Sequence, residues 1–498
     1  MTTAISRPAR GIVTAIALSC VLLAVTNALA ARVVGASDQS EYPPSHLSAS
    51  AASTSGETYT LYVPVVLNRH DEYSGIPFGI QVYGQDELSR QTARFSYVAE
   101  AGAQWMRWPI EWYTIEPVKT SPRTYNWTYW DQAISDAVSK DIRLILTIGG
   151  QPSWAAAYQM GPVTNTVDLL DFVRALVERY DADGVADAPG SPDIGHFELY
   201  NEPDNAWPGG AANGGYGLWG HNGAAYAALL RQVYPVVKQA NPHAKLVLGG
   251  LALDGFEELN QGPFDSGFLD DVLAACRGYQ CFDVMNFHYF PFYRSYWDPY
   301  GPDIIGKTNY VRQRLEAHGF GRLPIFVTEM SWGSGGDWGS PQLQNRYVVK
   351  GYVRGLAADL SVVSWYYLED TGDAGLPGLL SVSLEPKESF LVYQHMATEM
   401  LDGVAFRRAL TPAETGSSQL VGYVFWHSGR RLDVVWTEDG TRFNPDDDPT
   451  IFYTVQASSL RVVDMFGNEE WHADADDGVV DGRIRVVVNG APLYLEYY

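Results

Sequence analysis

The chain has 498 residues, with 58 acidic and 34 basic side chains, so its formal net charge is −24. This acidic excess argues against a nucleic-acid-binding protein, because phosphate contacts require a basic surface, and it disfavours an anionic polymer as substrate. Hydrophobic residues make up 46% of the chain and charged residues 18%, which is typical of a globular protein and excludes wholesale disorder.

The N-terminus has the pattern of a secretory signal peptide. Arg7 and Arg10 precede an uncharged run over residues 11–30, and the run ends in a small-x-small pattern. We therefore expect residues 1–30 to be a cleaved signal peptide and the protein to be secreted or held at the cell surface. An uncleaved anchor is the alternative, since about 20 apolar residues can span a bilayer, and only then would the protein contact a membrane.

The next segment, residues 31–74, is predicted to be a linker followed by a short apolar stretch. Residues 31–58 are rich in Ser, Ala and Thr, a composition that cannot bury enough apolar surface to fold.

Alternating strand and helix patterns run from residue 75 to residue 400, which favours a parallel sheet. Eight such units suit an α/β fold of the closed (β/α)8 or TIM-barrel type, with an open doubly wound sheet as the alternative. No glycine-rich phosphate-binding motif follows the first strand, so we expect neither a nucleotide nor another cofactor. The predicted strands are Phe78–Tyr83, Trp105–Pro109, Arg143–Gly149, His196–Asn201, Lys245–Gly250, Val284–Tyr289, Ile325–Glu329 and Val362–Leu368. The clearest predicted helices are Tyr129–Lys140, Val167–Tyr180, Ala224–Ala240, Thr308–His318 and Gln342–Leu360.

Two cysteines, Cys276 and Cys281, lie beyond the leader with four residues between them. A small-loop disulfide fits an oxidising compartment, and two unpaired thiols are the alternative. The pair lacks the pattern of a zinc site, and we predict no metal ligands in the chain.

The pattern changes after Leu401, where short β-branched segments alternate with turn residues. Residues 401–498 are therefore predicted to form a small all-β, sandwich-like domain. Its acidic runs at 446–448 and 474–477 lack the spacing of a calcium-binding EF-hand loop, so we interpret them as solvated turns. The predicted strands are Leu420–His427, Leu432–Thr437, Ile451–Val455, Leu460–Phe466, Arg483–Asn489 and Leu493–Tyr498.

Two glutamates follow apolar strands at positions where catalytic residues of a barrel are found, the C-terminal strand ends. Glu202 follows the fourth predicted strand and Glu329 ends the seventh. Two carboxyl groups about 5–5.5 Å apart can hydrolyse a glycosidic bond with retention, one as acid/base and the other as nucleophile, provided that their pKa values differ. For either glutamate alone, a solvated or arginine-paired carboxylate is the alternative.

Three further polar residues are predicted to bind substrate or support these glutamates. Arg107 is placed to keep Glu329 ionised, or else forms a structural salt bridge. Asn201 could bind a sugar hydroxyl, or cap the following helix. His288 could hydrogen-bond the nucleophile or a substrate hydroxyl, or be a core histidine.

Tryptophans are frequent near the predicted strand ends. Trp154, Trp207, Trp332 and Trp338 fall in loops, and Trp365 lies in the eighth strand. Flat aromatic rings pack against the C–H faces of sugars, so these residues are candidates for a sugar-binding cleft, with Trp365 the preferred platform. For any single tryptophan, a place in the core is the alternative.

At these positions the chain resembles the glycoside hydrolases that share a (β/α)8 barrel with catalytic glutamates after strands 4 and 7, including xylosidase-like and cellulase-like families. The resemblance covers roughly residues 75–400 and implies that Glu202 is the acid/base and Glu329 the nucleophile. The matching pieces are Asn201-Glu202-Pro203, Thr328-Glu329-Met330, Arg107, Trp365, Trp112–Pro117, Tyr125-Asn126-Trp127 and Asp131.

One departure from those families lies at the end of the sixth strand. The families often place His and Tyr two residues apart, whereas here the order is His288-Tyr289-Phe290. Tyr289 is kept as a candidate substrate-binding residue, with Tyr293 as a substitute.

These observations predict a secreted retaining glycoside hydrolase acting on a neutral oligo- or polysaccharide. A non-catalytic carbohydrate-binding protein on a degenerate barrel and a transglycosylase are the alternatives.

Overall fold

The computed structural model describes Tyr73 and residues 77–498 apart from 158–159, 207–218, 338, 373–374 and 439–447, together with the backbone of two N-terminal strands. The predicted signal peptide, Trp207, Trp338 and part of the acidic run 446–448 lie outside the described residues. Residues 1–68 and 69–498 are separate compact units. In the first, β1 (Ser48–Ala52) and β2 (Thr58–Tyr62) pair antiparallel.

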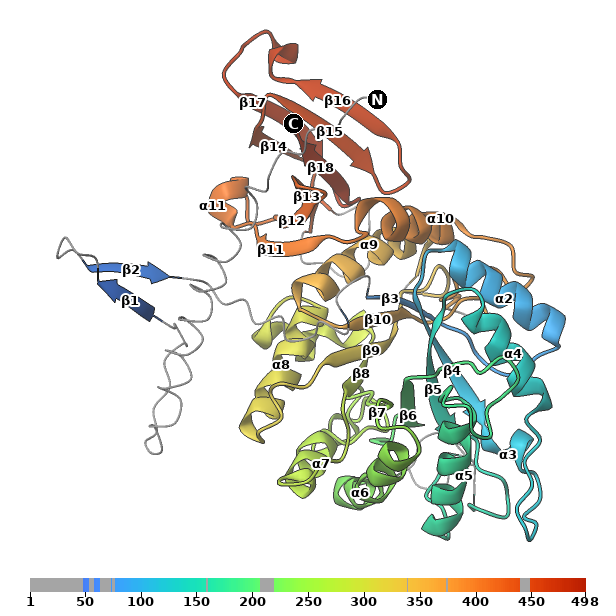
Figure 1. Cartoon of the computed structure of the whole chain (residues 1–498). Helices are drawn as coiled ribbons and strands as arrows, with labels where there is room; N and C mark the ends of the chain where they lie inside the picture. The colour runs from blue at the N-terminus through green and yellow to red at the C-terminus, as the bar shows by residue number, and fades with distance from the viewer. Residues whose placement is uncertain are drawn as a thin grey trace, which may run out of the picture. The chain divides into compact units, whose positions relative to one another are not determined.

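An eight-stranded parallel sheet forms the centre of the second unit (Figure 1). Isolated bridges between Val247 and Val284 and between Leu251 and Phe287 join its two end strands, so the sheet is a nearly closed barrel and the predicted fold is confirmed. The strands are β3 (Phe78–Gln81), β4 (Trp105–Glu111), β5 (Arg143–Gly149), β6 (His196–Asn201), β7 (Lys245–Gly250), β8 (Met285–Tyr289), β9 (Ile325–Met330) and β10 (Val362–Trp365).

Helices surround the strands and bury their apolar faces against them (Figure 1). In α5, for example, Leu169, Phe172, Val173 and Leu176 are buried, which is the helical spacing predicted from the sequence. The helices are α2 (Leu88–Glu100), α3 (Trp112–Ile115), α4 (Thr128–Val138), α5 (Thr166–Arg179), α6 (Gly223–Ala240), α7 (Phe268–Cys276), α8 (Ile304–Ala317), α9 (Pro341–Ala357) and α10 (Glu388–His395). Among the helices that the structure describes, none has the length and apolar character needed to cross a bilayer.

The C-terminal strands form an all-β domain, as predicted, and their pairing is antiparallel. A six-stranded sheet in the order β11-β12-β13-β18-β15-β16 accompanies the pair β14-β17, and apolar side chains of both sheets, including Val435 and Tyr453, share one cluster. In the second acidic run, Asp474 is buried and accepts backbone N–H groups of residues 481–483, so it closes a turn. The strands are β11 (Ala405–Ala409), β12 (Leu420–His427), β13 (Arg430–Thr437), β14 (Ile451–Gln456), β15 (Ser459–Asp464), β16 (Glu469–Ala473), β17 (Arg483–Val488) and β18 (Leu493–Tyr497).

Buried ion pairs connect the barrel to this β domain. Arg354 of α9 donates to Asp303 at 2.6 Å and to Glu438, next to β13, at 2.8 Å. These carboxylates hold the pKa of Arg354 well above its usual value although burial acts in the opposite direction. Carboxylates of both the barrel and the β domain therefore compensate the positive charge of Arg354.

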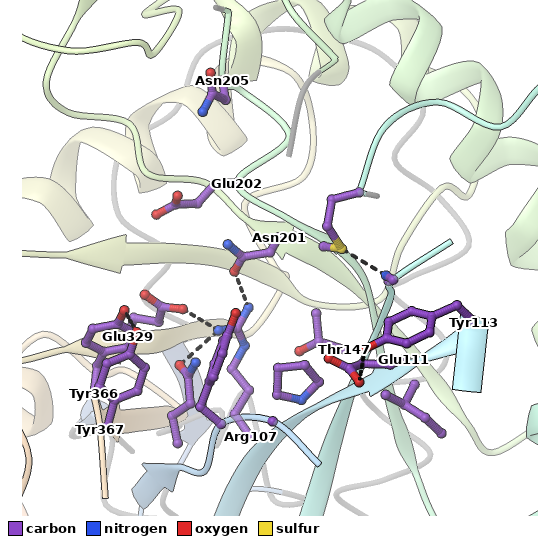
Figure 2. Close-up of a pocket in the computed structure, with 18 of the residues that line it drawn as sticks. Arg107, Glu111, Tyr113, Thr147, Asn201, Glu202, Asn205, Glu329, Tyr366 and Tyr367 are labelled. Atoms are coloured by element: carbon purple, nitrogen blue, oxygen red, sulfur yellow. Dashed lines mark hydrogen bonds and ion pairs between the residues drawn. The ribbon is translucent and has the colours of Figure 1, made fainter. Parts of the chain in front are cut away.

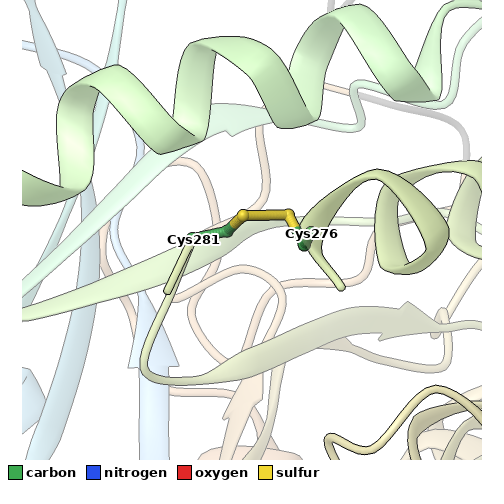
Figure 3. The surroundings of a disulfide bond; sticks show 2 residues. All are labelled: Cys276 and Cys281. Carbon is green, nitrogen blue, oxygen red and sulfur yellow. A yellow bond between two sulfur atoms is a disulfide. The ribbon is translucent and has the colours of Figure 1, made fainter. Parts of the chain in front are cut away.

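The cysteines lie at the end of α7, where Cys276 is joined to Cys281 by a disulfide (Figure 3). Both residues are buried, and the bond fastens the loop that leads from α7 toward β8.

Candidate active site

A cavity of about 450 Å³ lies at the mouth of the barrel where the C-terminal strand ends meet (Figure 2). Its lining includes both predicted glutamates, Glu202 and Glu329, as well as Arg107 and Asn201. Parallel strands bring their C-terminal ends to one side of a barrel, so residues distant in sequence converge there.

Arg107 lies beneath the cavity and links both sides of it. Arg107 extends from the middle of β4. Its Nη1 donates to Glu329 at 2.5 Å and to Gln81 at 2.9 Å, and its Nη2 donates to Asn201 at 2.6 Å. Arg107 is 1% exposed, and although its burial acts against the charged form, the neighbouring carboxylates raise its pKa above the usual value. The guanidinium is thus a fixed positive charge that favours an ionised Glu329.

Glu198 completes this arrangement, and sequence reasoning did not find it. It is fully buried in β6 and accepts hydrogen bonds from Arg107 Nε at 2.6 Å, Thr147 at 2.5 Å, the Gly250 amide at 2.8 Å and Asn286 at 2.8 Å. A charged side chain that is fully buried inside a strand requires such partners. The sequence feature that could have indicated this pair is the acid Glu198 in β6 together with Arg107 in β4, both in strands that bury apolar side chains.

His288 brings the two predicted catalytic carboxylates together. Its Nδ1 lies 3.0 Å from Oε1 of Glu202 and 3.5 Å from Oε2 of Glu329. Burial lowers the pKa of His288 to about 4, so the imidazole is neutral near pH 7. With its one proton on Nδ1, the ring can donate to either glutamate and hold both in place.

Close backbone packing fixes the position of this histidine. A Cβ at Gly250 would lie 2.2 Å from Nε2 of His288, so only glycine leaves room for the ring. The Gly250 carbonyl also accepts the amide of Glu202 at 2.9 Å. Glu202 itself has a φ of 44°, a left-handed conformation that non-glycine residues seldom adopt and that is concentrated at functional sites.

The two glutamates differ in their surroundings. Burial raises the pKa of Glu202 to about 7, with Arg107 and Lys307 acting in the opposite direction. Burial also raises the pKa of Glu329, but His288 and the direct hydrogen bond from Arg107 lower it. Glu329 therefore has the stronger support for its charged form, and Glu202 is the group that can carry a proton near neutral pH.

The predicted tryptophan platform is not part of the cavity lining. Trp365 is 0% exposed, and its indole donates to the Pro377 carbonyl at 2.9 Å, so it offers no surface to a ligand. The next two residues, Tyr366 and Tyr367, line the cavity instead and their hydroxyl groups contact each other.

Trp154 and Trp332 also lie outside the lining of this cavity. The indole of Trp154 donates to the Glu116 carbonyl at 3.1 Å, and its ring packs edge-on against Trp112. Trp332 is 5% exposed and stacks on Phe292 with ring centroids 5.0 Å apart. Both rings are integrated into the packing of the barrel.

Tyr289 is fully buried behind the cavity, whereas Phe290 lines it. Successive side chains of a strand point to opposite faces, so His288 facing the glutamates places Tyr289 away from them. The ring of Tyr289 lies 6.0 Å from the ammonium group of Lys307 on α8. Tyr293, the alternative tyrosine, is likewise absent from the lining.

Two groups of side chains in the described part of the chain have ligand atoms close enough to share a metal ion. One is Glu202, His288 and Glu329, whose ligand atoms lie within 4.8 Å of one another, and the other is Asp181, Asp183 and Asp187. In the first group, Arg107 already donates a hydrogen bond to Glu329, and His288 contacts both carboxylates. The aspartates of the second hydrogen-bond to amides of their own loop.

The fold and the site together define a (β/α)8 barrel with a two-carboxylate cavity at the mouth formed by the C-terminal strand ends. The sequence matches no protein-family model and no curated protein. Among solved structures, the chain is similar to a family 39 glycoside hydrolase from Bacteroides cellulosilyticus WH2, with a TM-score of 0.63 and 20% identity over 91% of this chain and 87% of that one.

Two further solved structures show the same architecture. One is a GH39 enzyme from Xanthomonas axonopodis pv. citri, with a TM-score of 0.54 and 14% identity over 85% of this chain and 94% of that one. The other is a GH30 endoxylanase from Clostridium papyrosolvens C71, with a TM-score of 0.53 and 13% identity over 85% and 97%. The resemblance predicted from the sequence is therefore confirmed at the level of the fold.

Proposed function

We propose that the protein is a secreted glycoside hydrolase that cleaves O-glycosidic bonds of a neutral oligo- or polysaccharide with retention of configuration. Glu329 attacks the anomeric carbon, and Glu202 protonates the leaving oxygen and then activates water. The observation that carries this proposal is that one carboxylate oxygen of Glu202 and one of Glu329 lie within 4.8 Å of each other. That spacing supports a retaining arrangement, because inverting enzymes separate the carboxyl groups by about 6.5–9.5 Å.

The surroundings support a division of roles between the two glutamates. Glu329 accepts a charge-assisted hydrogen bond from Arg107 and is suited to act as an anionic nucleophile. Glu202, with its pKa raised to about 7, is suited to hold the proton needed by the leaving group. The side-chain oxygen of Asn201 accepts a hydrogen bond from Arg107, and the side-chain N–H groups of Asn201 are suited to donate to a sugar hydroxyl.

Secretion is part of the proposal and is supported by the leader-like residues 1–30 and by the disulfide of Cys276 and Cys281, since disulfides persist in oxidising compartments. The intact mass of the protein recovered from culture medium should correspond to a chain that begins near residue 31. Recovery of the full-length chain in the membrane fraction would favour an uncleaved anchor.

A panel of 4-nitrophenyl α- and β-glycosides and neutral polysaccharides tests the activity. We expect hydrolysis of at least one member, and proton NMR should show that the sugar released first keeps the anomeric configuration of the substrate. Inversion in the first product would contradict the mechanism, and sugar binding without turnover across the panel would favour the non-catalytic alternative. Products longer than the substrate would indicate transglycosylation.

The pH dependence of kcat/KM should follow from the two carboxyl groups. Glu329 must be ionised, and its pKa is raised above the usual 4.5, so activity should be lost on the acid side at a pH above 4.5. Glu202 must be protonated in the first step, so activity should fall as pH rises through about 7. Initial rates from about pH 4 to pH 9 check this, and a profile that stays flat through pH 8 would contradict the role of Glu202.

A further inference from the structure

A second polar pair lies in the same cavity, away from the proposed catalytic residues. Glu111 and Tyr113 line the cavity on the side opposite Glu329, Tyr366 and Tyr367 (Figure 2). The Tyr113 hydroxyl donates to Oε2 of Glu111 at 2.8 Å. Burial, with a further contribution from Glu111, raises the pKa of Tyr113 to about 12, so the phenol remains a hydrogen-bond donor at neutral pH.

The backbone holds this pair in place before any ligand arrives. Trp112, between the two, is buried and stacks on Phe172 with ring centroids 4.9 Å apart, which directs its neighbours toward the cavity. Gly150 packs directly against them: a Cβ at this position would lie 3.1 Å from Cα of Glu111 and 3.3 Å from Cδ1 of Tyr113. The Gly150 carbonyl also accepts the amide of Tyr113 at 2.8 Å.

The charges around the cavity favour one class of sugar. Among the described residues that line it, Glu111, Glu202 and Glu329 are acidic and Arg107 is the one basic side chain. Arg107 is already paired with Glu198 and Glu329. A carboxylate on the substrate would therefore enter a cavity with excess negative charge and meet no available cation, whereas hydroxyl groups would meet acceptors.

We propose that Glu111, oriented by Tyr113, binds hydroxyl groups of the substrate and determines its specificity for sugars that carry no carboxylate. One oxygen of Glu111 is engaged by Tyr113, and its second oxygen accepts sugar hydroxyls. This assignment rests on the proposed glycosidase function and extends it to the class of sugar that the cavity admits.

The test compares wild type with Glu111→Gln on the 4-nitrophenyl glycoside that wild type cleaves best and on the matching uronide. Loss of a charged acceptor corresponds to about 10–100-fold weaker binding, so KM for the neutral glycoside should rise at least ~10-fold with a smaller change in kcat. The ratio of kcat/KM for the uronide over the neutral glycoside should rise at least ~10-fold, because one repelling charge is gone.

Tyr113→Phe provides a milder variant, which is needed if Glu111→Gln fails to fold. It should raise KM about 2–10-fold, because Glu111 loses the donor that orients it. Glu100→Gln, an exposed position on α2, is the matched control and should behave as wild type. KM and the uronide ratio both within twofold of wild type in folded Glu111→Gln would overturn the assignment. If that variant does not fold, KM within twofold of wild type in Tyr113→Phe would overturn it. Wild type that cleaves no glycoside would instead refute the proposed function.

Discussion

Glu329→Gln should lower kcat at least ~10³-fold on every substrate that wild type cleaves, which corresponds to about 4 kcal/mol in the activation barrier. Glutamine keeps the shape of the side chain but cannot form the covalent glycosyl intermediate. It also removes the negative charge that accepts the hydrogen bond from Arg107 at 2.5 Å. Without this carboxylate no covalent intermediate can form, whatever the leaving group, so better leaving groups should not restore turnover.

Steady-state kinetics with freshly purified variant measure this effect, and thermal unfolding shows whether the variant is folded. Small anions offer a sharper control: with Glu329→Ala, added azide should restore part of the turnover and give a glycosyl azide of inverted configuration, because the anion occupies the space of the missing carboxylate. Near-wild-type activity in folded Glu329→Gln would exclude Glu329 as the nucleophile.

Glu202→Gln should lower kcat/KM by about 10²–10⁴-fold for substrates with poor leaving groups, the range expected for loss of general acid catalysis. An aryl glycoside such as the 2,4-dinitrophenyl derivative needs little protonation of its leaving oxygen, so its cleavage step should be affected much less. The variant should also lose the decline in activity near pH 7, because the group whose pKa is raised to about 7 has been replaced.

The comparison of the two leaving groups distinguishes the acid/base role from a structural role. A structural defect would reduce both substrates equally, whereas loss of the acid changes their ratio. Equal reduction of both, with the basic limb of the pH profile retained, would contradict the assignment of Glu202.

The barrel could be predicted from the sequence because its strands are apolar runs separated by amphipathic helices. The edge strands β11 and β16 were missed, since their side chains are largely exposed and lack the apolar alternation of a half-buried strand. Helices α2, α7 and α10 were not among the clearest predicted helices. In α2 the buried positions include Gln91 and Arg94, which weakens the apolar pattern that marks a helix face.

The strand-end glutamates were predictable because a barrel places its chemistry at strand ends. Which side chains beside these glutamates face the cavity could not be predicted, because local irregularities in strand pairing decide it. The pairing of β10 with β9 shifts register between Val363 and Trp365. Such shifts change which side chains face inward, and periodicity alone does not reveal them.

Glu198 and Glu111 illustrate a second limit of the sequence. Each is a single acid in or at the end of a strand, and its role depends on residues contributed by other parts of the barrel. Arg107 and Asn286 donate to Glu198, and Gly150 packs closely against Glu111. Those partners are far away in the chain and are brought together only by the closed barrel.

The covalent intermediate is the central claim, and trapping it is the most direct test. Wild type incubated with a 2-deoxy-2-fluoro glycoside of the preferred sugar, carrying a good leaving group, should be inactivated and gain the mass of one fluorosugar. Peptide mass spectrometry should locate that label on Glu329. A label on another residue would contradict the assignment of Glu329 as nucleophile. Hydrolysis with inversion and no labelled protein would contradict the retaining mechanism.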